Sequence, residues 1–212
     1  MIDIVVPRNN EAKFVNRAIM LGCKGLIFLY DSKNKNNVNN ALKIKKQEKR
    51  LKIFVGFLGM KQKKIKDADL YFSTKSDRKF LKGQVDAVYD IEFNIQDTMK
   101  QRQGGLNQVL CNLMKDNKVS YLISFNSLLN SGRRGALIGK MMQNVKLCQK
   151  YKAKFGIATF ASDPEEMRNP KDLEAFLRLM GVKDTKKVMA RVAEMAAEQT
   201  NKKLLIPGVE QI

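Results

Sequence analysis

The chain has 212 residues, of which 44% are hydrophobic, so it is long enough for one large α/β domain with a packed core. Forty Lys and Arg against 21 Asp and Glu give a formal net charge of +19, which favours a polyanionic partner, nucleic acid first and a membrane surface second. No apolar run approaches the roughly 18 residues of a spanning helix and the N-terminus lacks a signal-like apolar core, so we expect a cytoplasmic protein.

Apolar and β-branched runs predict seven strands along the chain. They are expected at Ile2–Val6, Gly25–Tyr30, Lys52–Leu58, Ala68–Ser73, Asp86–Asp90, Val119–Phe125 and Phe155–Thr159. Helices are expected from Asn10 to about Leu21, where Gly22 would end the first one, and then at Ala41–Arg50, Lys75–Lys82, Leu106–Lys115, Arg133–Lys152, Asp172–Met180 and Thr185–Gln199.

Alternation of strand and helix without a Pro-, Gly- or Ser-rich linker is typical of parallel strands with crossover helices. A closed barrel and an open doubly wound sheet both fit. Seven units at similar spacing favour a TIM-barrel-like α/β barrel, irregular at the eighth position. We expect residues 1–212 to form one such domain, with the last two helices covering the barrel.

The stretch 119–154 is the most informative part of the chain. A buried strand is followed by a polar elbow at Asn126–Gly132 and then by a helix that starts near Arg133. Leu137, Met141, Val145 and Cys148 share one face of this helix, while Gln143, Lys146 and Lys150 share the other. From Asn117 to Lys154 there are eight Lys or Arg and no acid, an imbalance expected opposite an anionic partner.

The string GALIGKMM, at Gly135–Met142, is only superficially like a phosphate loop. The first Gly of that motif would fall at Arg134, and Met141 stands where a hydroxyl residue would hold magnesium. We interpret the string as the first turns of a helix.

The residues for metal or acid–base chemistry are few. The sequence has no His, the commonest general base and transition-metal ligand. Carboxylates on or after predicted strand ends could in principle hold a metal, but helix capping and ion pairs are the simpler roles for Asp3, Asp90, Glu92, Asp163, Glu165 and Glu166. Three cysteines, odd in number and far apart, are expected to be buried thiols.

Arginine can grip phosphate with two parallel hydrogen bonds, so arginines in loops or at helix starts are the best candidates for contacts to nucleic acid. Five lie at such places: Arg78, Arg102, Arg133, Arg134 and Arg168. Lys146 and Lys150 add charge on the exposed face of the helix in the stretch 119–154.

Several motifs together resemble protein component three of archaeal ribonuclease P, the counterpart of the thirty-kilodalton subunit of the eukaryotic enzyme. They are the VDAV strand, the strand with its polar LL-N/S elbow, Arg134 at the next helix start, the KYK at Lys150–Lys152, and the R-x-P-x-D-L that begins at Arg168. The resemblance is densest from Val85 to Gly181. The chain departs from the family at ATFAS, where Phe160 is interposed among small residues.

The resemblance implies a TIM-type barrel related to metal-dependent phosphoesterases but lacking their metal ligands. It also implies a subunit of the ribonucleoprotein that removes the 5′ leader of precursor tRNA, with catalysis and Mg²⁺ on the RNA and no cofactor on this chain. The expected partners are the catalytic RNA, a small second protein subunit, the other protein subunits and, indirectly, precursor tRNA. Basic residues that match the family pattern are Arg78, Arg102, Lys118, Arg134, Lys150 and Arg168. A free-standing barrel enzyme with a carboxylate-bound metal is the alternative.

Overall fold

Seven parallel strands form one sheet in the order in which they occur along the chain. The computed structural model describes residues 1–31, 38–62, 65, 67–94 and 103–204. The strands are β1 (Ile2–Val5), β2 (Gly25–Asp31), β3 (Lys52–Leu58), β4 (Leu70–Ser73), β5 (Ala87–Tyr89), β6 (Ser120–Ser124) and β7 (Phe155–Ala158). Each predicted strand is confirmed to within two residues at its ends.

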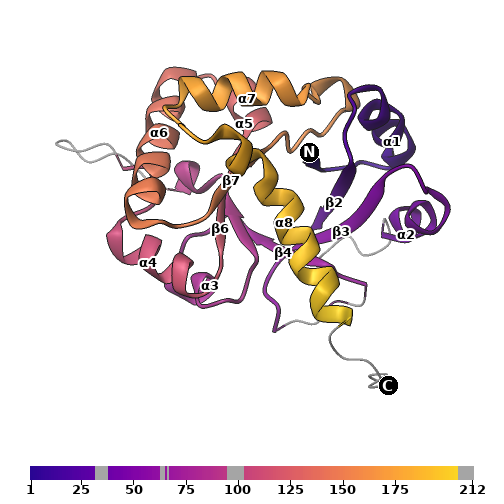
Figure 1. The fold of residues 1–212 in the computed structure, drawn as a ribbon, viewed down its shortest axis with the longest axis horizontal. Coiled ribbons are helices and arrows are strands. Elements are labelled where there is room, and N and C mark those ends of the chain that lie inside the picture. The colour runs from indigo at the N-terminus through magenta and orange to yellow at the C-terminus, as the bar shows by residue number, and fades with distance from the viewer. Residues whose placement is uncertain (32–37, 63–64, 66, 95–102, 205–212) are drawn as a thin grey trace.

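Helices surround the sheet (Figure 1). They are α1 (Glu11–Met20), α2 (Val38–Gln47), α3 (Arg78–Leu81), α4 (Gln108–Asp116), α5 (Phe125–Leu129), α6 (Arg134–Tyr151), α7 (Pro170–Leu179) and α8 (Thr185–Leu204), with 3-10 turns η2 (Ile91–Asn94) and η3 (Pro164–Glu166). In the part of the chain that the structure describes, none of the helices combines the length and apolar character needed to cross a membrane.

The polar elbow predicted at Asn126–Gly132 is wrong in one respect, because its first half is the helix α5. The Ser124 hydroxyl accepts a hydrogen bond from the Ser127 N–H and caps this helix. Ser and Asn favour both turns and helix N-caps, so their presence alone does not distinguish the two structures.

The sheet curves into a nearly closed barrel in which β7 comes next to β1. The carboxylate of Asp3 is fully buried and accepts hydrogen bonds from the Thr159 N–H at 2.8 Å and the Thr159 hydroxyl at 2.6 Å. Beyond it, Val6 N–H donates to the Ala161 carbonyl at 2.8 Å. One isolated parallel bridge, between Val5 and Ala161, joins the two edges, so the seven strands form a nearly closed barrel. The described residues place no eighth strand at the expected irregular position.

Apolar side chains fill the barrel from end to end. At the carboxyl ends of the strands, Tyr89 stacks on Phe160 with ring centroids 4.2 Å apart. At the amino ends, α8 lies across the barrel and inserts apolar residues, among them Val192 and Met195 (Figure 1). α7 instead packs in the outer helical layer through Leu173, so only one of the two tail helices covers the barrel as predicted.

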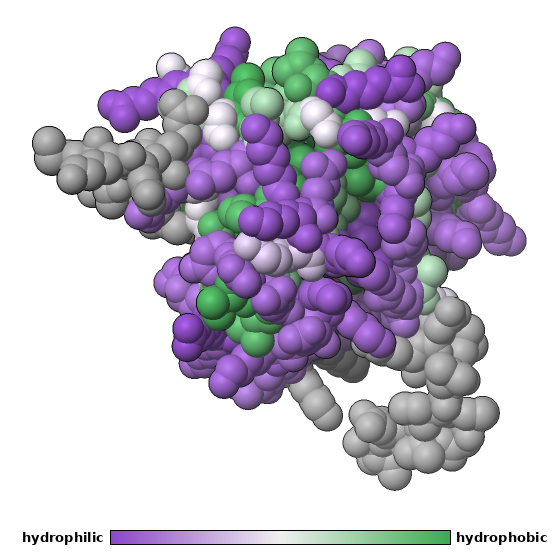
Figure 2. Space-filling view, turned by 60° about the vertical axis from the view of Figure 1, so that its left-hand side comes forward, coloured by the Kyte–Doolittle hydropathy of each residue, from purple (hydrophilic) through white to green (hydrophobic). Residues whose placement is uncertain are grey.

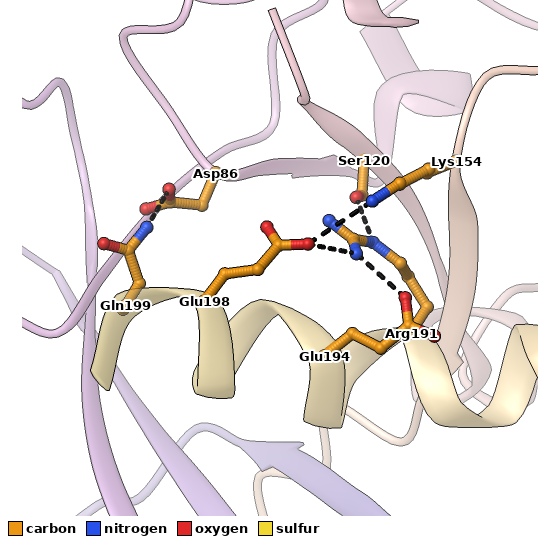
Figure 3. A network of polar contacts seen from close by, with 7 residues as sticks. All are labelled: Asp86, Ser120, Lys154, Arg191, Glu194, Glu198 and Gln199. Carbon is orange, nitrogen blue, oxygen red and sulfur yellow. Dashed lines mark hydrogen bonds and ion pairs between the residues drawn. The ribbon is translucent and has the colours of Figure 1, made fainter. Parts of the chain in front are cut away.

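A polar network fastens α8 to the starts of the strands (Figure 3). Arg191 is only 3% exposed; its Nε donates to the Ser120 hydroxyl at 2.8 Å, and its Nη1 contacts Glu194 and Glu198 at 3.0 Å each. At the other end of the network, Gln199 donates to Asp86 at 2.7 Å. Apolar insertion and these contacts together hold the helix across the amino end of the barrel.

Candidate nucleic-acid interface

The carboxyl end of the barrel, where TIM-barrel enzymes carry their active sites, is packed with aromatic rings. Phe160, the residue that departs from the family pattern, adopts a φ of 52° and turns its ring into the barrel against Tyr89. Both rings are almost fully buried. The two rings occupy the space in which a substrate of a barrel enzyme would otherwise meet the strand ends.

The carboxylates near this end are engaged in separate hydrogen-bond networks. Glu92 is 2% exposed and accepts hydrogen bonds from the Tyr121 hydroxyl and from Asn144 Nδ2, and burial raises its pKa to about 7. Asp90 accepts from the Ser127 hydroxyl at 2.8 Å, and burial raises its pKa to about 6. No group of three Asp, Glu or Cys side chains is arranged to hold a metal among the described residues.

The acids after β7 stabilise local structure, as the sequence analysis predicted. Asp163 caps η3 and forms a capping box with Glu166. Glu165 forms an ion pair with Arg17 at 3.4 Å. These three carboxylates are accounted for by helix capping and pairing.

The helix α6 confirms the two faces predicted for it. Leu137, Met141, Val145 and Cys148 are buried, and all three cysteines of the chain are buried free thiols. Lys146 and Lys150 are exposed and line a shallow groove of about 380 Å³ on the outer surface. The string that is like a phosphate loop forms the first turns of this helix, as interpreted.

Arg133 and Arg134 lie at the start of α6 and are both exposed. One guanidinium nitrogen of Arg134 donates to the Leu129 carbonyl at 2.6 Å. At a rise of 1.5 Å per residue, Arg134 lies about 24 Å along the helix from Lys150. The predicted basic residues of α6 are therefore spread along its whole length.

Arg78 is on the same side of the molecule as the exposed face of α6. It lines a cleft of about 650 Å³ formed with the start of α4, and Gln143 and Leu147 of α6 line both this cleft and the groove beside Lys150. Figure 2, which brings the α6 side forward, shows that hydrophilic side chains cover most of this face.

Two other predicted contacts, Arg168 and Lys118, are not brought to this side. Arg168 is half-buried near the carboxyl end of β7, and its Nη1 donates to the carbonyls of Glu165 and Met167. Lys118 precedes β6 at the opposite end of the barrel. Arg102 lies outside the described residues. The seven predicted positions that the structure describes thus do not form one patch.

Basic residues gather at the amino ends of the strands, and among them only Lys118 was a predicted contact. We call this end of the barrel the N-terminal rim and define it as the segments that lead from a helix into β2, β3, β5, β6 and β7, with their flanking residues. Its exposed basic residues are Lys24, Lys49, Arg50, Lys52, Lys82, Lys118, Lys152 and Lys154. Each precedes or begins a predicted strand, and parallel strands begin at one edge, so this spacing was an available signal.

Only three acids belong to the N-terminal rim, and two of them are paired. Glu48 contacts Arg50 at 2.8 Å. Asp86 is buried and contacts Lys61 at 2.7 Å. Asp116 is exposed at the end of α4. The rim therefore keeps a strong positive charge.

The C-terminal rim consists of the segments that follow β1, β2, β4, β5, β6 and β7 and lead to α1, α2, α3, α4, α6 and α7, with their flanking residues. Among the residues that the structure describes, it carries six basic and eight acidic side chains. The basic ones are Arg8, Lys75, Arg78, Arg133, Arg134 and Arg168; the acidic ones are Glu11, Asp31, Asp77, Asp90, Glu92, Asp163, Glu165 and Glu166. Among its described residues, charge is nearly balanced at this end.

Comparisons with known proteins agree with the resemblance seen in the motifs. No model of a known protein family matches the sequence. Over 95 residues the chain is 26% identical to ribonuclease P protein component 3 of Methanocaldococcus jannaschii; the match covers 44% of this chain and 41% of that protein, so it spans about two-fifths of the length of the curated relative.

Two solved structures share the fold. A chain in a cryo-EM structure of archaeal ribonuclease P with mature tRNA matches 99% of this chain and 95% of its own length, with a TM-score of 0.75 and 21% identity. Histidinol phosphate phosphatase of Lactococcus lactis, solved with zinc, L-histidinol and phosphate, matches 85% of this chain and 92% of its own, with a TM-score of 0.54 and 10% identity. The TIM-barrel-like fold is thus common to an RNA-containing assembly and to a metalloenzyme.

Proposed function

We propose that this chain is a protein subunit of ribonuclease P, the ribonucleoprotein that cleaves the 5′ leader from precursor tRNA. One observation carries the proposal: the local sequence match and the match over the whole fold independently lead to the same assembly. The chain would act in the cytoplasm with the catalytic RNA, a small second protein subunit and the other subunits, and would meet precursor tRNA indirectly.

Its role would be to bind and stabilise the catalytic RNA, which carries the chemistry and the Mg²⁺ ions. Lys and Arg release condensed counterions from RNA and reduce the repulsion between packed RNA helices, so the RNA stays folded at lower magnesium. A net charge of +19 supports that role. The expected contacts include Arg78, Arg133 and Arg134, with Lys146 and Lys150 on the same side, and Lys118 and Arg168 elsewhere. Arg102, which lies outside the described residues, is a further expected contact.

The alternative is a free-standing metal-dependent phosphoesterase, which the shared fold of histidinol phosphate phosphatase keeps open. The packing of the barrel end disfavours it. Tyr89 and Phe160 fill the space at the strand ends, and Asp90 and Glu92 accept hydrogen bonds from neighbouring side chains. Metal analysis of the purified protein discriminates the two: a stoichiometric, tightly bound ion would support the enzyme.

Reconstitution tests the proposed function. The ribonuclease P RNA and the other protein subunits are assembled with and without this chain, and leader cleavage is measured over a magnesium titration. We expect the chain to lower the magnesium concentration needed for cleavage. Identical titrations with and without it would refute the proposal.

Arg134→Ala tests one expected contact, by measuring affinity for the RNA at several salt concentrations. If Arg134 contacts a phosphate, its removal weakens RNA binding and reduces the salt dependence of affinity by about one charge. Arg134→Lys, which keeps the charge but loses the guanidinium fork, should retain most of that dependence.

A further inference from the structure

We propose that the N-terminal rim is a docking surface for the phosphate backbone of a folded RNA. This inference rests on the proposed function and adds to it a location, at the end of the barrel opposite to the one that barrel enzymes use. Three observations carry it: the clustering of charge, the conformation of two of the lysines, and the arrangement of the acids around them.

The barrel brings together basic residues that are scattered along the chain. Backbone hydrogen bonds link adjacent strand starts, with the Lys52 N–H donating to the Lys24 carbonyl and the Tyr121 N–H donating to the Lys154 carbonyl. Neighbouring strands are about 4.8 Å apart, so consecutive rim segments are close enough for their lysines to reach successive phosphates of one RNA strand. Lys24, Lys52, Lys118 and Lys152 form no ion pair with any described residue.

Two rim lysines occupy backbone positions at which glycine is the favoured residue. Helices α1 and α7 end with Gly22 and Gly181 in the left-handed region, at φ of 70° and 80°. Helices α4 and α6 end with the same turn, but Lys118 and Lys152 occupy the left-handed position at φ of 58° and 59°.

The hydrogen bonds of these turns are equivalent. The N–H of the residue after the left-handed position donates to a carbonyl five residues earlier in each case: Cys23 to Ala18, Val182 to Leu177, Val119 to Met114 and Ala153 to Cys148. A side chain in this conformation is sterically disfavoured, and glycine avoids the strain. The chain therefore has charge at two rim positions where backbone preference alone would select glycine.

The acids beside the rim do not oppose an anionic partner. Glu198 contacts both Arg191 and Lys154. Burial pushes the pKa of Glu198 upward, but these two cations hold it below its ordinary value. Glu198 is thus paired within the protein, while Lys24, Lys52, Lys118 and Lys152 keep no ion pair with a described residue and can face a partner.

The composition of the rim favours RNA over an acidic protein. Seven of its eight basic residues are lysines, which are depleted at protein–protein interfaces. Lysine is a compact point charge, suited to phosphates whose positions are set by the shape of an RNA helix. The rim also offers no arginine cluster for paired recognition of carboxylates.

Affinity for the ribonuclease P RNA, measured over a range of salt concentrations, tests the inference. The rim variant is Lys118→Gly with Lys152→Gly, and the matched control is Lys13→Gln with Lys75→Gln, which also removes two exposed charges but lies outside the rim. We expect the rim variant to bind roughly tenfold more weakly at low salt, with a slope of log affinity against log salt reduced by about two.

The control should bind like the wild type. The melting temperature of the rim variant should equal or exceed that of the wild type, because glycine relieves the left-handed strain, so a loss of binding cannot be assigned to misfolding.

The other outcomes are distinct. If the wild-type chain does not bind the RNA, the proposed function itself fails. If the wild type binds and the rim variant binds equally well, or if rim and control variants weaken equally, the function stands and the rim proposal is overturned. Normal RNA affinity combined with failed assembly of the holoenzyme would make the rim a protein-binding surface instead, which also overturns it.

Discussion

The two rims of the barrel are the two ends of the same seven strands, yet they differ in charge, in packing and in the state of their acids. At the C-terminal rim, charges of both signs are nearly balanced, an aromatic pair fills the barrel, and burial raises the pKa of Asp90 and Glu92. At the N-terminal rim, basic residues outnumber acids, a helix fills the barrel, and hydrogen bonds from Arg50 lower the pKa of Glu48.

The difference shows how one fold can serve different chemistries. In TIM-barrel enzymes, the carboxyl ends of the strands carry the reacting groups and the amino ends contribute stability. Here the carboxyl end is packed like a core, while the amino end carries eight exposed basic residues against three acids. Substitutions at the two ends of the barrel should therefore have different consequences.

Phe160→Ala should destabilise the protein by about 3 to 5 kcal/mol, because it removes a buried ring and leaves a cavity beside Tyr89. Urea denaturation measures the loss. Phe93→Ala is the control, since Phe93 is 56% exposed and its truncation should cost little. Equal effects of the two changes would contradict the view that the C-terminal rim is closed by packing.

Stability should also depend on pH through Glu92. Burial raises its pKa from an ordinary 4.5 to about 7, so the folded state holds a proton that the unfolded state releases. The free energy of unfolding contributed by this group is then greatest below about pH 4.5 and falls as pH rises toward 7, by up to roughly 3 kcal/mol.

Glu92→Gln removes this titration. We expect the unfolding free energy of the wild type, relative to that of the variant, to fall steadily from pH 4.5 to 7.5. Denaturation at each pH measures it. A constant difference would mean that Glu92 is ionised in the fold. Glu165→Gln, an exposed carboxylate of the same rim, serves as the control.

Arg191→Met should cost about 2 kcal/mol, because it keeps the apolar stem but removes charge-assisted hydrogen bonds to Ser120, Glu194 and Glu198. Hydrogen exchange should show faster opening of α8. Glu194→Gln weakens only one half-exposed partner and should cost less than about 1 kcal/mol. An unchanged α8 in both variants would show that apolar insertion alone holds the helix.

Much of the fold could be predicted because its strands are buried on both faces. A run such as Gly25–Tyr30 is continuously apolar, and Gly22 marks the end of the preceding helix. The seven-strand barrel was predicted, but the contacts by which its two edges meet were not, since they depend on Asp3 meeting Thr159 across almost the whole chain. The role of Phe160 was also missed, because its left-handed backbone directs the ring inward.

The candidate interface was predicted less well, and the reason is spatial. Arg134 and Lys150 could be located from the pattern of one helix, whereas Lys24 and Lys154 become neighbours of one rim only when the barrel closes. Arg168 was selected for its guanidinium, but part of that group donates to carbonyls of its own loop. Side-chain type indicates what a residue can bind, and the fold decides whether it is available.

The closure between β1 and β7 also has a consequence for how the protein is made. The strands pair in the order of synthesis, so β1 keeps an unpaired edge until the segment around Thr159 has emerged, and α8 arrives later still. Contacts this distant in sequence carry a large loop-closure entropy and slow folding. The basic residues of the N-terminal rim therefore assemble into one surface at the end of biogenesis, and a nascent chain does not present it.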